Sequence, residues 1–495
     1  MAQGKDKGSS AVIIELEILP VAAVVILLAS RRVTVLQAGL AGALLTIPAV
    51  AMALGPTKPL LTFLMRNAAA GAWLAWQAIS VVLAGLIFYN VLRVADQVLF
   101  SGDTYSPIAF SYRQIFAVCF LLGPFLESVT GFGVALIITI PILLRMGVKG
   151  PMVAVLALFS QTLVPWGALA IGTVIGAGLA DVPLHTVGVR SALITGPLLF
   201  GYLIVFWSYA HREGWRVDLW QRIDDVAWVG ALVVMLYLSN QFVEVQAAGL
   251  IATSLLLGVR FWRDVRISAA ARQALIRVAQ PYVWLTLIIL VTRVFPPLRG
   301  FLRGLWLIQP SRAWPVFSVF YQVSFWLLAV AIVYGLKIRL SKTQWKAVGV
   351  GVWHAGRAPV MVILAFVVMA QWISRAGIAA DLAMQWAHFA GPVAIWASPV
   401  FSAIAGFLTG SNTASNALVM PLQMALAKSG GLSPGWAAAM QNTAGSNFTL
   451  LSPVRIAMGA ALLHAPNVES SIYRLAFPLG VMVLVMLVLM MVLGL

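Results

Sequence analysis

Long apolar segments with almost no charge constrain this chain more than any other feature. The stretches 227–238 and 481–495 are examples, and of all 495 residues 61% are hydrophobic and 9% charged. A soluble domain carries about 25% charged residues, so the composition excludes a secreted or cytosolic enzyme and a disordered protein. A membrane-spanning helix needs about 20 apolar residues, whereas a membrane β-barrel would show alternating segments of about ten. We predict an all-α, polytopic membrane protein of about 12–14 transmembrane helices, including broken or re-entrant ones.

The formal net charge of +17 lies mainly between the apolar segments. One basic loop carries Arg260, Arg263, Arg266, Arg272 and Arg277, and a second carries Lys337, Arg339, Lys342 and Lys346. Cytoplasmic loops of membrane proteins carry such an excess of Lys and Arg, so both loops are assigned to the cytoplasm. A nucleic-acid partner is not expected, because it would require the cations on one face.

Two pairs of polar interruptions divide the chain into halves. A polar stretch around Thr130 has a counterpart around Ser411, and one around Thr162 has a counterpart around Thr443; both pairs lie 281 residues apart. The same offset brings the apolar runs of the two halves into register. We predict a single transmembrane domain, 1–495, with a first repeat at 33–214, a linking segment with the Arg-rich loop at 215–313, and a second repeat at 314–495.

The charges indicate that the two halves have opposite orientations. Arg31 and Arg32 directly precede the first helix of the first half, whereas the second basic loop follows the equivalent helix of the second half. Opposite ends of matching helices then face the cytoplasm. Arg299, Arg303 and Arg312, which precede the second half, argue for a parallel arrangement instead. The prediction is two inverted repeats.

The first pair of interruptions indicates a binding site. Unpaired backbone groups in lipid cost several kcal/mol each, so helices break in a membrane only where they line a cavity, and matched breaks in two halves indicate a transporter's site. Thr130 and Gly131 lie at one break, and Ser411, Asn412 and Thr413 lie at the other. Free amides at a helix N-terminus suit an anion. The alternative is a pair of structural kinks satisfied by their own hydroxyls.

The second pair of interruptions extends the predicted site. Gln161 and Thr162 lie beside Pro165, which removes a backbone donor and interrupts one apolar run. Asn442 and Thr443 are expected to interrupt the matching run of the second half. The alternative is that these side chains only make hydrogen bonds between helices, worth about 0.6 kcal/mol each.

Two ionisable residues complete the set of candidates. Glu127 lies in an otherwise uncharged stretch, and an acid within a membrane segment is a functional candidate, here a proton carrier. It could instead cap a half-helix or pair with an arginine such as Arg113 or Arg455. Arg455 follows the second break and could bind a carboxylate or extend to the membrane interface.

Several kinds of chemistry have no support in the sequence. The chain lacks a P-loop and the common membrane-hydrolase motifs, so an enzyme is not expected. Its five histidines are scattered, and the single cysteine, Cys119, excludes an internal disulfide and a cysteine-rich metal site. No metal and no cofactor are predicted.

The residues at the breaks resemble the L-lactate permease family of 2-hydroxycarboxylate transporters. The stretch 125–133 is similar to the family's Glu-Gly-x-x-Gly-Phe-Gly motif, and 406–416 contains the more specific Gly-Ser-Asn-Thr-x-Ser-Asn. Ser128 replaces the glycine that usually follows the glutamate, and Gln161 stands where asparagine is common. The resemblance implies proton symport of lactate, or of glycolate, across the bacterial inner membrane.

The predicted roles follow from the paired breaks and this resemblance. The carboxylate is assigned to Ser411, Asn412 and Thr413 with amides near Gly131, the 2-hydroxyl to Thr162, Asn442 and Thr443, and the proton to Glu127. Thr130, Gln161 and Arg455 are further lining candidates. The alternatives are a Na⁺-coupled carrier of a dicarboxylate or other organic anion, and a membrane-embedded enzyme or channel. A homo-oligomer is compatible with the sequence.

Overall fold

The fold is a bundle of helices, several of them long enough to span a bilayer. The computed structural model describes residues 6–56, 59–99, 111–131, 133–264, 269–463 and 468–493. Among these residues, nine helices are long and apolar enough to cross a membrane, or ten if a bent pair is counted as one span, and five shorter apolar helices accompany them. The predicted all-α, multi-pass architecture is confirmed, with nine or ten candidate spans among these residues where the sequence predicted about 12–14 helices including broken ones.

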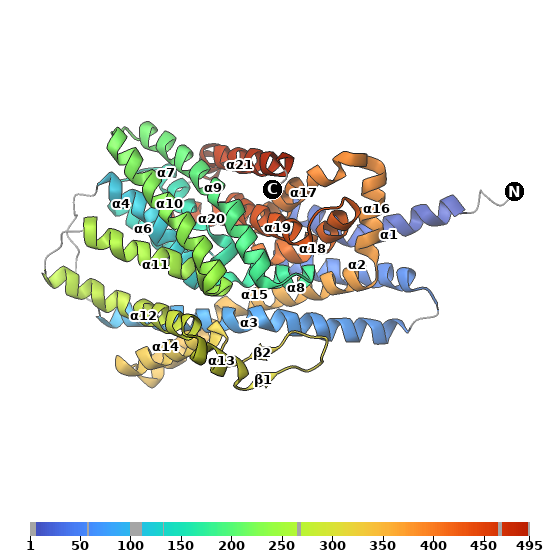
Figure 1. Cartoon of the computed structure of the whole chain (residues 1–495), viewed down its shortest axis with the longest axis horizontal. Coiled ribbons are helices and arrows are strands. Elements are labelled where there is room, and N and C mark those ends of the chain that lie inside the picture. Colours follow the sequence, from blue (N-terminus) through green and yellow to red (C-terminus); the bar gives the residue numbers. More distant parts are fainter. Residues whose placement is uncertain are drawn as a thin grey trace.

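Figure 1 shows how the helices are arranged along the chain. The first part contains α1 (Asp6–Ala29), α2 (Val35–Leu54), α3 (Leu60–Leu99), α4 (Tyr112–Ala117), a π-helical turn (Val118–Leu122), α5 (Gly123–Thr130), α6 (Val134–Arg145), α7 (Pro151–Ala157), two 3₁₀ turns (Leu158–Gln161 and Val164–Trp166), α8 (Gly167–Ala180) and α9 (Leu184–Arg212). The middle part contains α10 (Leu219–Phe242), α11 (Val245–Asp264), α12 (Ala269–Val294), α13 (Pro296–Gly304) and a two-stranded antiparallel sheet of β1 (Leu307–Ile308) and β2 (Phe317–Ser318). The last part contains α14 (Val323–Lys337), α15 (Lys342–Arg375), α16 (Ile378–Ala390), a 3₁₀ segment (Gly391–Ala397), α17 (Ser398–Thr409), α18 (Asn412–Ser429), α19 (Pro434–Phe448), a 3₁₀ turn (Thr449–Leu451), α20 (Pro453–Leu463) and α21 (Val468–Val492).

The two longest helices, α3 and α15, pack side by side in opposite directions (Figure 1). At one end, Trp372 Nε1 of α15 donates to the carbonyl of Leu64 of α3 over 3.0 Å. At the other end, Gly351 of α15 packs directly against the Asn90 side chain of α3. The missing side chain at Gly351 lets the helices approach closely, as small residues do in membrane bundles.

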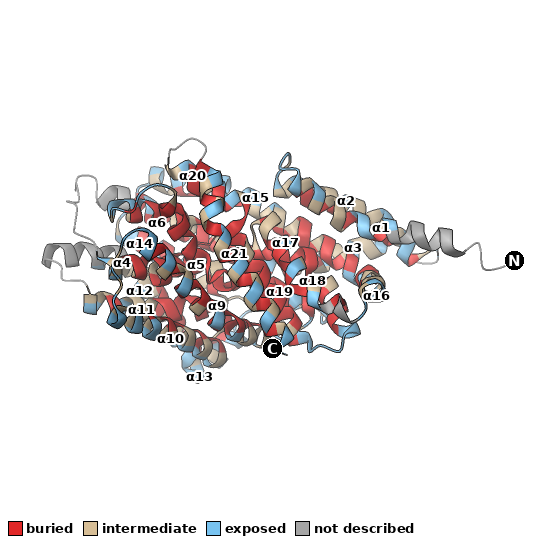
Figure 2. Ribbon diagram, turned by 90° about the horizontal axis from the view of Figure 1, so that it is seen from above, coloured by how far each residue is buried: buried red, intermediate tan, exposed pale blue. Residues whose placement is uncertain are grey.

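Two hydrophobic clusters hold the bundle together. One contains residues of α1, α2, α3, α14 and α15, among them Phe88 and Phe366. The other joins α7, α9, α10 and α21 and includes Phe159 and Phe206, whose rings lie 5.7 Å apart. Buried residues fill the centre of the molecule (Figure 2). Residues of α18 belong to the first cluster and residues of α19 to the second, so this helical hairpin lies where the clusters meet.

The basic segments differ from the loops expected from the sequence. Arg260 and Arg263 lie in the last turns of α11, and Arg272 and Arg277 lie in α12; Arg266 is outside the described residues. In the second basic loop, Lys337 belongs to α14, and Lys342 and Lys346 belong to α15. Of its four cations, only Arg339 lies between the two helices. The helices that flank both segments include most of these cations because arginine and lysine favour helix, and Arg260 is buried against Asp264, 2.8 Å away.

Candidate functional site

The chain is broken at both places of the first predicted pair. Helix α5 ends at Gly131 (φ 62°), and α6 begins after Gly133 (φ 79°); Phe132 between them lies outside the described residues. Helix α17 ends at Gly410 (φ 62°), and Ser411 then caps α18, its hydroxyl accepting from the Ala414 amide. These positive φ angles favour glycine. Each break therefore leaves the N-terminus of a following helix inside the protein.

The second predicted pair is broken only in part. Two 3₁₀ turns interrupt the chain between α7 and α8, at Gln161 and Pro165 as expected. The expected interruption at Asn442 and Thr443 is wrong, because α19 runs through both as a continuous helix and the break follows at 449–452. The polar groups of α19 are side chains on an intact helix, which can bond to neighbouring helices without freeing the backbone.

Glu127 and Arg455 form a buried ion pair between the two halves. Arg455 Nη2 lies 3.8 Å from Glu127 Oε1, and the residues are 6% and 2% exposed. Gln161 Nε2 donates to Glu127 Oε2 over 3.0 Å. Any Cβ at Gly133 would overlap the guanidinium group. Of the alternatives open from the sequence, the structure shows the pair, and Arg455 points inward to Glu127.

Asn442 is the centre of a second polar cluster. Its Oδ1 accepts from Asn412 Nδ2 and Asn416 Nδ2, each over 2.9 Å. Its Nδ2 donates to Thr173 Oγ1 and Ser191 Oγ, each over 3.0 Å. The cluster thus joins α8 and α9 of the first half to α18 and α19 of the second.

Two glycines of α8 make room for the asparagines of α18. A Cβ at Gly172 would lie 2.5 Å from Asn412 Nδ2, and a Cβ at Gly176 would lie 2.8 Å from Asn416 Nδ2. Asn416 Nδ2 also donates to the Gly172 carbonyl over 2.9 Å. Gly172 and Gly176 therefore form a Gly-x-x-x-Gly helix-packing motif, and here it holds the predicted site residue Asn412 and its neighbour Asn416 in position.

Contacts at the helix breaks connect the Glu127–Arg455 ion pair to the asparagine cluster. Thr173 Oγ1 donates to the Pro165 carbonyl over 2.5 Å, so the break before α8 is tied to the asparagine cluster. A Cβ at Gly167, directly after this break, would lie 3.6 Å from Glu127 Oε1. A Cβ at Gly410 would lie 2.9 Å from the hydroxyl of Ser452, which caps α20 three residues before Arg455. The breaks, the ion pair and the asparagine cluster are parts of one region.

Several predicted site residues have buried polar atoms without a hydrogen-bond partner among the described residues. These atoms are Gln161 Oε1, Thr162 Oγ1, Asn412 Oδ1, Thr443 Oγ1 and Arg455 Nε. Buried polar groups are almost always satisfied by protein, water or ligand. Their concentration among the residues around the breaks is what a polar ligand site requires.

Three further predicted residues have hydroxyl groups that are bonded at their own helix or buried in it. The Thr130 hydroxyl donates to the Leu126 carbonyl of its own helix over 2.7 Å. The Ser411 hydroxyl is occupied as a helix cap, and Thr413 is buried in the first turn of α18. At these positions the backbone amides of the α18 N-terminus, rather than the hydroxyls, are the groups suited to an anion.

Sequence reasoning missed Thr173 and Ser191, and it left Asn416 out of the site. Thr173 stands within the glycine pair of α8, and Ser191 lies in the long apolar helix α9. A single hydroxyl in an apolar helix gives little signal, because it usually bonds its own backbone. The repeated Ser-Asn pattern at 411–416 was the signal available for Asn416.

Comparison with known proteins identifies the family. The family model described as L-lactate permease matches residues 13–495. The chain belongs to the L-lactate permease family. It is a multi-pass membrane transporter rather than an enzyme. The L-lactate permease of Escherichia coli K12 is 26% identical over 466 residues, covering 82% of this chain and 81% of that protein. The glycolate permease GlcA of the same strain is 23% identical over 477 residues, with 82% and 81% covered.

Two solved structures are also similar to this chain. One is MtrF of Neisseria gonorrhoeae, described with a class of antimetabolite efflux pumps, with a TM-score of 0.45, 15% identity, and 87% of this chain and 82% of that chain covered. The other is the YdaH transporter of Alcanivorax borkumensis, with a TM-score of 0.46, 14% identity, and 87% and 86% covered.

Proposed function

We propose that this member of the L-lactate permease family imports a small 2-hydroxymonocarboxylate, of the lactate and glycolate class, together with a proton by alternating access. The names of the relatives support the substrate class. The observation that carries the coupling is the buried pair of Glu127 and Arg455 beside the broken helices. When an anion arrives, the arginine of such a neutral pair can bind the anion in place of the glutamate.

The coupling step is an exchange of the arginine's partner. In the absence of substrate, Arg455 neutralises Glu127. An incoming carboxylate takes the guanidinium group, whose Nε has no partner among the described residues. Glu127, now without its counter-charge in a buried site, takes up a proton. The loaded site carries the same net charge as the empty one, because one anion and one proton have been added.

The substrate's polar groups match the unsatisfied atoms around the breaks. The carboxylate lies between Arg455 and the amides at the start of α18, where Ser411, Asn412 and Thr413 are. Gly410 at this break packs against Ser452, next to the arginine. The 2-hydroxyl bonds Thr162 and Thr443, whose hydroxyls lack partners among the described residues, or Asn442. Thr130, Gly131 and Gln161 line the side that faces Glu127.

The energetics favour a proton as the coupling ion. Bringing a monovalent anion into a cell that is negative inside costs about 2.3 kcal/mol per 100 mV. Adding one proton makes the step electroneutral, and each pH unit of inward gradient then contributes about 1.4 kcal/mol.

Alternating access is supported by two inverted repeats, at 33–214 and 314–495. Helix α3 begins at residue 60 and α15 at residue 342, 282 residues apart; α9 begins at 184 and α21 at 468, 284 apart. In each pair the equivalent helices run antiparallel. Tyr209 of α9 donates to the Leu475 carbonyl of α21, while Gly201 packs against Met482 and Met486. Repeats related by an axis in the membrane plane are expected to pair in this way.

The decisive experiment is uptake by proteoliposomes under separate pH and Na⁺ gradients. Purified protein should accumulate labelled lactate when the outside is acidic, without Na⁺, and internal lactate should accelerate uptake by exchange. Accumulation driven by Na⁺ alone, or a preference for dicarboxylates, would replace this proposal with the sodium-coupled alternative. Uptake without any acceleration by internal substrate would contradict a carrier mechanism.

A further inference from the structure

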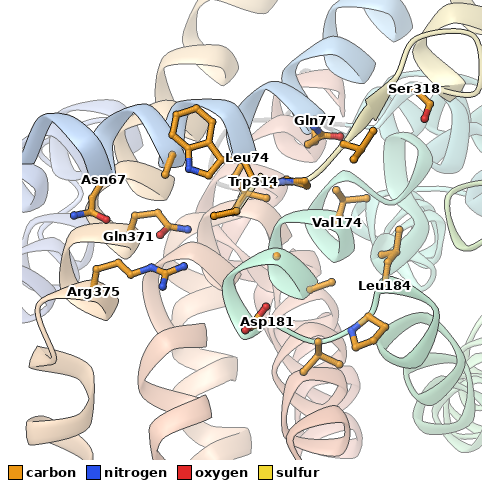
Figure 3. Close-up of a pocket in the computed structure, with 18 of the residues that line it drawn as sticks. Asn67, Leu74, Gln77, Val174, Asp181, Leu184, Trp314, Ser318, Gln371 and Arg375 are labelled. Atoms are coloured by element: carbon orange, nitrogen blue, oxygen red, sulfur yellow. The ribbon is translucent and has the colours of Figure 1, made fainter. Parts of the chain in front are cut away.

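A large cleft lies beside α8 (Figure 3). The asparagine cluster is on the other side of this helix. Its volume is about 1220 Å³, and its walls come from α3, α8 and the C-terminal end of α15, with Trp314 of the β1–β2 segment beside it. Val174 and Gly178 line the cleft, while Gly172 and Gly176 of the same helix face the asparagines. One helix therefore separates the cleft from the proposed transport site.

The cleft carries unpaired positive charge. Arg66 of α3 and Arg375 of α15 line it, both are exposed, and neither makes a hydrogen bond or ion pair with another described residue. Arg303, also in the lining, has Glu244 3.8 Å away. Asp181, after α8, is the other acid of the lining. Two free guanidinium groups against one free carboxylate leave the wall net positive, which attracts anions.

Uncharged amides stand next to these arginines. Asn67 and Gln371 come from the same two helices as Arg66 and Arg375 (Figure 3). Gln77, further along α3, is 7% exposed, and its Nε2 has no partner among the described residues. A buried donor without a partner at the wall of a cleft is a group that a polar ligand can satisfy.

The cleft lies at the membrane face opposite the basic segments. Helix α15 begins beside Lys342 and Lys346 and ends at Arg375, and its 34 residues extend over about 51 Å. The basic segments are assigned to the cytoplasm by their excess of Lys and Arg. The end of α15 that lines the cleft therefore faces the outside.

We infer that this cleft is an outer vestibule that binds the small carboxylate before it reaches the transport site. Arg66 and Arg375 bind the carboxylate, and the amides of Asn67, Gln77 and Gln371 bond its remaining polar atoms. This inference rests on the proposed function. Ligand pockets usually have volumes of about 300–1000 Å³, so this wider cleft holds the anion weakly and exchanges it quickly. The vestibule sets the apparent affinity at the outer face, and the interior site sets the maximal rate.

The first test measures uptake kinetics of Arg66→Gln, Arg375→Gln and the double variant in right-side-out vesicles with labelled lactate. The outer KM should rise about 3- to 10-fold for each single variant and further for the double variant, with a maximal rate close to that of the unchanged protein. The difference in KM between the variants and the unchanged protein should become smaller at high salt, because exposed charges are screened. The matched control is Arg312→Gln, which removes an exposed arginine near the cleft but outside its lining.

The second test uses the buried position of Cys119, which is 1% exposed. In Val316→Cys, at a position of the lining that is 44% exposed and contributes no proposed ligand group, the new thiol is the accessible one, and a membrane-impermeant maleimide should label it from outside, more slowly when lactate is present. Unchanged KM values together with labelling that lactate does not slow would overturn the vestibule while leaving the proposed function intact. A wild-type protein that takes up no lactate would instead refute the proposed function, and this inference with it.

Discussion

Arg455 Nη2 lies 3.8 Å from Glu127 Oε1, so two oppositely charged side chains from the two halves of the chain neutralise each other inside the protein. Neither charge would be stable there alone, because a buried ion without a partner loses its hydration. The same region holds groups that suit a small hydroxy acid: the amides at the start of α18, and the unsatisfied hydroxyls of Thr162 and Thr443. In the proposed mechanism, substrate and proton then bind only as a neutral set.

Replacing Glu127 by glutamine should uncouple transport from the proton gradient. The variant keeps the size of the side chain and, like the protonated acid, has one acceptor carbonyl oxygen and a donor group, but it cannot take up or release a proton. Under an inward gradient of about one pH unit, the unchanged protein should accumulate lactate about ten-fold, and the variant should only equilibrate it. Exchange of internal for external lactate should continue, as measured by counterflow in proteoliposomes.

The control for this change is Glu213→Gln, because Glu213 is an exposed acid after α9. It should accumulate lactate as well as the unchanged protein. Full uphill accumulation by Glu127→Gln would remove this residue from the proton path.

Breaking the ion pair from one side should destabilise the protein more than removing both charges. Arg455→Gln leaves the Glu127 carboxylate buried without its counter-charge, a loss of about 3–5 kcal/mol in the free energy of unfolding. The double variant Glu127→Gln/Arg455→Gln should recover much of that stability but not transport. Thermal unfolding of the detergent-solubilised variants measures the first effect, and uptake measures the second. Strictly additive losses in the double variant would show that the two side chains do not interact.

Asn412→Ala should weaken substrate binding. The change removes a side chain whose Oδ1 is unsatisfied and whose Nδ2 bonds Asn442. A hydrogen bond to a charged group contributes about 1.5–3 kcal/mol, so kcat/KM for lactate should fall about 10- to 100-fold. Ser429→Ala, at the far end of the same helix, should leave uptake unchanged. Wild-type rate and affinity in Asn412→Ala would place the substrate elsewhere.

Gly172→Ala should impair transport although alanine favours helix. Its methyl group would lie 2.5 Å from Asn412 Nδ2, so Asn412 must move away from Asn442. Gly258→Ala in α11, where a Cβ meets no atom within 4 Å among the described residues, gains up to about 1 kcal/mol of helix stability and should transport normally. Equal activity of the two variants would show that the close approach of α8 to α18 is unimportant for function.

The sequence by itself determined the membrane class, the helical fold and the helix breaks at Gly131, at Gly410 and at 161–165. These properties depend on local composition: apolar length decides what crosses a bilayer, and glycines such as Gly131 and Gly410 mark where the backbone turns. The local pattern also identified Glu127, Asn412 and Asn442 as unusual residues in apolar surroundings.

Only the tertiary structure decided which of these residues meet. The pairing of Glu127 with Arg455, the contacts of Thr173 and Ser191 with Asn442, and the intact course of α19 through Asn442 all depend on how distant helices pack. A side chain in a membrane helix can bond its own backbone or a neighbour, and local sequence does not distinguish these outcomes. The cleft beside α8 likewise exists because α3, α15 and the β1–β2 segment come together from separate parts of the chain.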